Sequence, residues 1–128
     1  MPRPPHDARF PGTWKALQEL QASGTIRLLG ISNFNGAQIE AMARDHDVPP
    51  DVLQNKFDPF HQGDQLNRAG QDLVALAASK GIATVGYSTL RGWPLAMSPA
   101  EDARVAAVAA KHDRTASQVL LRWALQSG

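Results

Sequence analysis

Short aliphatic runs alternate along the chain with segments whose apolar residues recur at helical spacing. The aliphatic runs predict strands at residues 25–31, 52–57 and 82–87. The helical spacing predicts helices at residues 13–23, 35–45, 66–80, 98–111 and from 115 onward. Strands separated by helices indicate parallel strands joined by right-handed crossovers. The pattern therefore predicts an α/β fold with about three parallel strands and flanking helices.

Capping residues sharpen the ends of several helices. Asn35 is suited to cap the second helix, and Ser98 with Glu101 and Thr115 with Gln118 have the spacing of capping boxes. Residues 1–12 contain four of the nine prolines and few apolar residues, which is typical of an extended tail. One domain is therefore expected over residues 13–128, preceded by that tail.

Composition narrows the class of protein. The 128 residues carry 13 Lys and Arg against 12 Asp and Glu, so the net charge of +1 favours neither nucleic acid nor an anionic membrane as a partner. No cysteine is present, which excludes disulfides and thiolate chemistry. No apolar run approaches a membrane span, and the first residues lack the apolar core of a secretory signal. We expect a cytoplasmic protein.

Polar side chains follow each predicted strand, where parallel α/β folds bind ligands. Ser32, Asn33 and Gln54 carry hydroxyl and carboxamide groups that pair with both halves of a planar amide, and Tyr87 offers a ring for stacking. The alternative for Ser32 and Asn33 is local capping of the next helix. No metal ligand pair and no glycine-rich phosphate loop are found in the sequence.

Five segments together resemble the middle and later part of the aldo-keto reductases. They are TWKAL (13–17), GTIRLLGISNF (24–34), VLQNKFDPF (52–60), GIATVGYS (81–88) and TASQVLLRWALQ (115–126). The resemblance runs in order over about residues 13–128, and the motifs are specific in combination. It implies part of a (β/α)₈ barrel, of which a complete example needs about 250 residues.

The resemblance also implies a cofactor and a reaction. Aldo-keto reductases reduce aldehydes and ketones with NADP(H). Ser32, Asn33 and Gln54 fall where family members hold the nicotinamide carboxamide, Tyr87 falls where a tyrosine stacks on the ring, and Ser88 begins the loop along the pyrophosphate. These five residues are the predicted cofactor-binding set.

The departures from the family pattern concern catalysis. The family's catalytic Asp, Tyr, Lys and His precede the matched stretch, and the single Tyr of this chain is Tyr87. We therefore assign no catalytic residue and no metal site, and expect this chain alone to be inactive. Asp58 and His61 follow the second strand, with no charged partner evident from the sequence.

Three functional classes remain open at this point. The chain represents part of a carbonyl reductase, or a noncatalytic module for cofactor sensing or protein interaction, or a small doubly wound domain unrelated to reductases. Three parallel strands leave two open sheet edges, so we also expect self-association or poor solubility.

Overall fold

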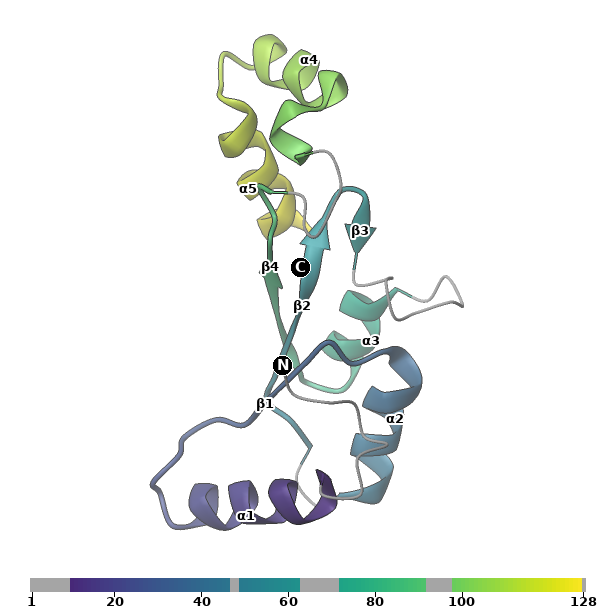
Figure 1. The fold of residues 1–128 in the computed structure, drawn as a ribbon, viewed down its shortest axis with the longest axis vertical. Helices are drawn as coiled ribbons and strands as arrows, with labels where there is room; N and C mark the ends of the chain where they lie inside the picture. The colour runs from purple at the N-terminus through teal and green to yellow at the C-terminus, as the bar shows by residue number, and fades with distance from the viewer. Residues whose placement is uncertain (1–9, 47–48, 63–71, 92–97, 128) are drawn as a thin grey trace.

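Helices separate the three parallel strands, a short hairpin strand follows the second of them, and two helices follow the last strand (Figure 1). This computed structural model describes residues 10–46, 49–62, 72–91 and 98–127. The elements are α1 (Phe10–Ala22), β1 (Gly30–Ser32), α2 (Gly36–Asp45), β2 (Val52–Asp58), β3 (His61–Gln62), α3 (Leu73–Ser79), β4 (Ala83–Tyr87), the 3₁₀ turn η2 (Pro99–Glu101), α4 (Ala103–Lys111) and α5 (Ala116–Gln126). Among the described residues, no helix combines the length and apolar character that crossing a membrane requires.

The central strand of the sheet is β2, which takes part in every described strand pairing. It pairs in parallel with β1 and with β4, and its end pairs antiparallel with the short β3. The three parallel strands joined through helices confirm the predicted α/β fold. Figure 1 places α1, α2 and α3 toward one end of the strands and α4 and α5 toward the other. Three parallel strands joined through helices are what the resemblance to part of a (β/α)₈ barrel implies.

The main core lies between one face of the sheet and the first three helices. Ile31 of β1 pairs with Leu53 of β2, and both side chains are buried. Trp14 of α1 and Ile39 of α2 are buried in the same cluster. The other members of this cluster are Leu29, Phe34, Met42, Leu73, Ala77 and Ile82.

A smaller packed region joins α5 to the end of β2. The rings of Phe57 and Trp123 stack with centroids 4.9 Å apart and an interplanar angle of 18°. Gly86 of β4 makes room for this stack, because a Cβ at that position would lie 2.9 Å from the Cβ of Phe57. A methyl group there is closer than real Cβ contacts allow, so the glycine is needed for packing.

The predicted tail is too long by three residues. α1 begins at Phe10, before the expected helix start at residue 13, so residues 10–12 are helical. Pro11 is tolerated because the first turn of a helix leaves its backbone N–H groups unbonded. Phe10 also packs its ring against Trp14 and Phe34, with centroid distances of 6.1 and 5.7 Å. Residues 1–9 lie outside the described part of the chain.

The first predicted strand is too long at its beginning. Only Gly30–Ser32 forms a strand, whereas residues 25–31 were expected to do so. The partner strand begins at Val52, which pairs with Gly30, so residues before Gly30 have no strand beside them. Leu28 is accordingly 53% exposed, although its apolar character favoured a buried strand.

The helix expected at residues 98–111 is divided. η2 is followed by α4, which is capped by Asp102, whose carboxylate accepts a hydrogen bond from the Arg104 backbone N–H. The Ser98 hydroxyl instead donates to the carbonyl of Leu90, so the proposed capping box at Ser98 is wrong. In the helix expected at residues 66–80, α3 begins after an N-cap at Asp72. The expected start at Leu66 lies outside the described residues.

Two predicted caps are confirmed. Asn35 caps α2 and Thr115 caps α5, each with a reciprocal bond to the glutamine three residues later. Ile39 and Met42 of α2 are buried, whereas Ala43 is exposed, so α2 packs one face against the core.

Candidate nicotinamide site

Three of the five predicted cofactor residues lie on one face of the sheet. Ser32 pairs with Gln54, so their side chains project from the same face of neighbouring parallel strands. Lys56, two residues beyond Gln54, pairs with Tyr87, which places Tyr87 on that face as well. Ile31 and Leu53 point the opposite way, into the helices. The face that carries Ser32, Gln54 and Tyr87 is therefore turned away from the main core, and it is the open face of the sheet. Gln54 lies within β2 rather than at its end.

Asn33 joins this group through a hydrogen bond. The Tyr87 hydroxyl donates to Asn33 Oδ1 over 2.7 Å, so the ends of β1 and β4 are connected above β2. The bond joins residues 54 positions apart in the sequence. The side chain of Asn33 therefore bonds Tyr87, and the N-cap of α2 is Asn35.

Two of the predicted residues have an unusual backbone conformation. Asn33 has a φ of 60° and Ser88 a φ of 56°, in the left-handed region that side chains disfavour. Only one other non-glycine residue of the described chain, Asp113, shares this property. Strained backbone of this kind concentrates at binding sites, and here it occurs directly after two strands of the sheet.

The sequence interpretation overlooked Asn55. Its side chain is 5% exposed and points to the helix-facing side, since it alternates with Gln54. Its Oδ1 accepts a hydrogen bond from the backbone N–H of Asn33 over 2.7 Å, and its Nδ2 donates to the carbonyl of Phe34 over 2.9 Å. The signal in the sequence is its position in the strand: Asn55 shares a face with the apolar residues Leu53 and Phe57, two positions before and after it.

A buried ionic cluster lies at the end of β2. Lys56 Nζ donates to Asp58 Oδ2 and lies 3.0 Å from His61 Nδ1, which is 3.1 Å from Asp58 Oδ1. Lys56 and Asp58 are 3% and 0% exposed. Burial raises the pKa of Asp58, but hydrogen bonds from Lys56, the Phe60 backbone N–H and His61 outweigh it and lower the pKa below its usual value.

The cluster supplies the charged partner that Asp58 and His61 lacked in the sequence analysis. Lys56 and Asp58 are two residues apart on a strand, so their side chains share a face. A tight turn at Pro59 and Phe60 then brings His61 of β3 opposite Asp58. The spacing of the lysine and the aspartate was the available signal. All three residues of the cluster hold the end of β2 and its hairpin together.

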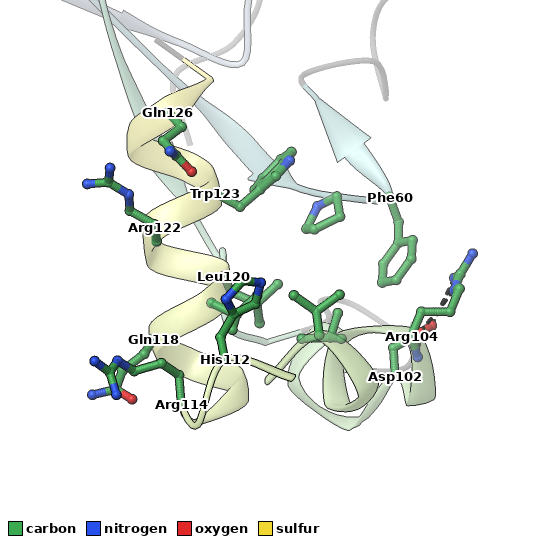
Figure 2. A pocket seen from close by; sticks show the side chains of 14 residues that line it. Phe60, Asp102, Arg104, His112, Arg114, Gln118, Leu120, Arg122, Trp123 and Gln126 are labelled. Atoms are coloured by element: carbon green, nitrogen blue, oxygen red, sulfur yellow. Dashed lines mark hydrogen bonds and ion pairs between the residues drawn. The ribbon is translucent and has the colours of Figure 1, made fainter. Parts of the chain in front are cut away.

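A separate groove of about 910 Å³ lies between α4, α5 and the turn after β2 (Figure 2). Trp123 and Leu120 of α5 lie on one side, with Phe60 and Arg104 opposite. None of the five predicted cofactor residues lines it. Arg104 lies 5.0 Å from the centre of the Phe60 ring and forms an ion pair with Asp102, 2.9 Å apart. The groove begins directly after the end of β2 but does not include the proposed cofactor-binding residues.

The described residues contain no group of three or more His, Asp or Glu side chains arranged to hold a metal ion. Apart from the buried Lys56–Asp58 pair at the end of β2, the face that carries Ser32, Gln54 and Tyr87 offers neutral hydrogen-bonding groups and one aromatic ring. Those groups suit a planar, uncharged amide attached to a ring.

Comparison with known proteins agrees with the resemblance in the sequence. The sequence model described as Aldo/keto reductase family matches residues 1–128. The chain is 38% identical over 126 residues to NAD(P)H-dependent D-xylose reductase of Scheffersomyces stipitis, covering 91% of this chain and 37% of that protein. It is 37% identical over 120 residues to aldo-keto reductase family 1 member A1 of Homo sapiens, covering 89% of this chain and 35% of that protein.

Solved structures show the same relationship. Gox0644 in its apo form superposes with a TM-score of 0.77 at 33% identity, over 97% of this chain and 42% of that one. A Bombyx mori aldo-keto reductase in complex with NADP superposes with a TM-score of 0.72 at 28% identity, over 91% of this chain and 38% of that one. The chain thus spans between about a third and two fifths of the length of these relatives.

Proposed function

Because the chain belongs to the aldo/keto reductase family, we propose that the open face of its sheet binds the nicotinamide half of NADP(H). The observation that carries this proposal is the shared face of Ser32, Gln54 and Tyr87, with Asn33 bonded to the Tyr87 hydroxyl. Three of these side chains belong to β1, β2 and β4, and the fourth, Asn33, directly follows β1. Preorganised polar groups of this kind lower the cost of binding.

The chemistry of these side chains fits the proposed ligand. Gln54 is exposed, so its carboxamide is available to both the donor and the acceptor of a nicotinamide carboxamide. Ser32 lies level with it on the neighbouring strand and offers a hydroxyl. The Tyr87 side chain is partly exposed and supplies a ring for stacking. We place Ser88 at the start of the pyrophosphate contacts.

A carbonyl compound is the proposed substrate of the whole enzyme, to which the bound cofactor would supply a hydride. The carbonyl oxygen must then gain a proton as the hydride arrives. Tyr87 is the only tyrosine of the chain, and its hydroxyl donates a hydrogen bond to Asn33 Oδ1. We therefore expect this chain alone to bind the cofactor without reducing a carbonyl substrate. We also expect it to be a cytoplasmic protein.

The test is a calorimetric or NMR titration of the purified chain with NADPH. We expect a dissociation constant near or above about 1 mM, which corresponds to about 4 kcal/mol of binding free energy. Gln54→Ala should weaken binding, whereas Val85→Ala should leave it unchanged. Val85 is a suitable control because it pairs with Gln54 on the same face and carries no polar group. Equal binding by wild type and Gln54→Ala would contradict the proposed site.

Turnover distinguishes a reductase from a noncatalytic cofactor-sensing or interaction module. NADPH consumption with a panel of aldehydes should stay at background for this chain. Activity that vanishes in Asp58→Asn or His61→Gln would show that the buried cluster replaces the family's acid, and would overturn the expectation. Activity that appears only when a complementary part of a relative's barrel is added would support part of a reductase over a sensor module.

A further inference from the structure

The backbone of Asn33 is held in its left-handed conformation by Asn55. The Asn33 N–H points at two acceptors, Asn55 Oδ1 at 2.7 Å and the Gln54 carbonyl at 3.1 Å. A residue with a φ of 60° persists only where the surrounding structure fixes it. Here the fixing contacts come from β2, directly beneath the loop that Asn33 begins.

Asn55 hydrogen-bonds the backbone of two successive residues of that loop. While its oxygen accepts from Asn33, its Nδ2 donates to the carbonyl of Phe34 over 2.9 Å. Phe34 is 1% exposed, so its backbone cannot exchange this partner for water without opening the core. Both halves of the Asn55 carboxamide are thus engaged, and the loop cannot rotate while they hold.

The fixed loop also determines what Asn33 presents to a ligand. Its Oδ1 accepts the Tyr87 hydroxyl, which leaves the two hydrogens of Nδ2 for any further bond. Asn33 therefore offers a donor and recognises an acceptor such as a carbonyl oxygen. The same bond restrains the Tyr87 ring, so one buried residue governs two groups of the site.

We propose that Asn55 is a positioning residue of the nicotinamide site. It holds Asn33 in the left-handed conformation, and through Asn33 it sets the direction of the Asn33 amide and the orientation of the Tyr87 ring. This inference rests on the proposed function for the identity of the ligand. The Asn55–Asn33–Tyr87 chain of bonds joins protein groups only, so part of the inference can be tested without ligand.

The ligand-free test uses the single tyrosine of the chain. With ¹³Cζ-labelled tyrosine, the protein gives one resonance, whose shift reports hydrogen bonding of the phenol. Asn33→Ala and Asn55→Ala should both move this resonance toward the value of a solvated phenol. Leu120→Ala is the control, because Leu120 is 1% exposed and lies in α5, away from these contacts. An unchanged resonance in Asn55→Ala would overturn the coupling.

The ligand test uses reduced nicotinamide mononucleotide as the probe. Asn55→Ala should weaken binding about 2- to 10-fold, the range for loss of one net hydrogen bond, and Leu120→Ala should not weaken it. Affinity lost equally in Asn55→Ala and Leu120→Ala would assign Asn55 a purely structural role and refute the proposal.

Two further results separate this inference from the proposed function. If adding the probe to the wild type changes no NMR chemical shift of Ser32, Gln54 or Tyr87, the proposed function fails. The ¹³C resonance of Tyr87 still decides whether Asn55 controls the Tyr87 hydroxyl. If Asn55→Ala does not fold, Tyr87→Phe tests the same link from its other end. It keeps the stacking ring and frees Asn33 Oδ1, so binding should weaken and the backbone amide signal of Asn33 should shift. No change in either would refute the proposal.

Discussion

The two faces of the same three strands differ in almost everything except their backbone. On the helix-facing side, Leu53 is 1% exposed and packs among the residues of three helices. One position along the strand, Gln54 is exposed, and its neighbour Val85 is 42% exposed. The packed face buries most of the apolar side chains, whereas the open face carries exposed polar groups and, at one end, the buried Lys56–Asp58 pair. A sheet therefore keeps binding chemistry separate from folding by alternation alone.

The largest effect should come from breaking the ionic cluster that closes one end of the open face. Asp58→Ala leaves the Lys56 ammonium buried without its carboxylate, which should cost about 3–5 kcal/mol of unfolding free energy. The double variant Lys56→Met and Asp58→Leu should be less destabilised than Asp58→Ala. Urea denaturation measures both. A double variant as unstable as the single one would show that the pair itself is strongly stabilising.

Truncating an apolar side chain on the packed face should lower the free energy of unfolding nearly as much. Truncating an apolar side chain on the open face should lower it far less. Leu53→Ala should lose about 2–5 kcal/mol because it leaves a cavity in the main core. Val85→Ala, one strand away on the open face, should change stability by less than about 0.5 kcal/mol. The same denaturation curves compare them. Similar losses would mean that the open face is covered in solution.

Filling Gly86 tests the packing at the far end of the helix-facing side. Gly86→Ala places a methyl 2.9 Å from the Cβ of Phe57 and should cost about 1–3 kcal/mol through overpacking. Trp123 fluorescence should also change, because the Phe57 stack must shift. Gly30→Ala is the control, since its methyl would meet its nearest atoms at 3.5 and 3.6 Å, an ordinary contact.

Self-association should reveal whether the open face is exposed in solution. We expect the chain to sediment as a dimer or larger species, because β1 and β4 have no outer neighbour among the described strands. Val85→Lys should shift the equilibrium toward monomer by introducing like charges on that face. A wild-type chain that sediments as a monomer and melts cooperatively would contradict this prediction.

The smallest effect should be the acid sensitivity of a carboxylate away from both faces. Hydrogen bonds from Arg104 lower the pKa of Asp102 from 3.8 to about 2. A lowered pKa stabilises the fold above pH 3.8, and this contribution is lost as the pH falls toward about 2. Asp102→Asn should flatten the pH dependence of unfolding within this window. A full-sized slope in that variant would place the acid sensitivity elsewhere.

Local contacts were predictable from the sequence, whereas distant ones were not. The caps at Asn35 and Thr115 depend on a bond to the third residue onward, so a short motif contains all the information. Asn55 bonds residues 21 and 22 positions away, and Tyr87 bonds Asn33 over 54 positions. Such partners are known only once the register of the strands is known.

The length of β1 shows the same limit. The aliphatic residues 25–29 have the composition of a strand, but a strand also requires a neighbour to bond with. Gly30 is the first residue with a partner on β2, and nothing near Gly30 in the sequence marks it as such. The motif resemblance succeeded for the fold because it compares whole segments, in which the register is already implicit.

The central place of β2 has a consequence for how the chain acquires its fold during synthesis. Val52 pairs with Gly30, made 22 residues earlier, and with Ala83, made 31 residues later. Each new strand therefore adds beside one that has already emerged, across loops of similar length, which suits folding from the N-terminus. β2 acts as the template for both additions. A slip of β2 by one residue would turn Leu53 to the open face and Gln54 into the core. The alternation of apolar and polar residues therefore disfavours a wrong strand register.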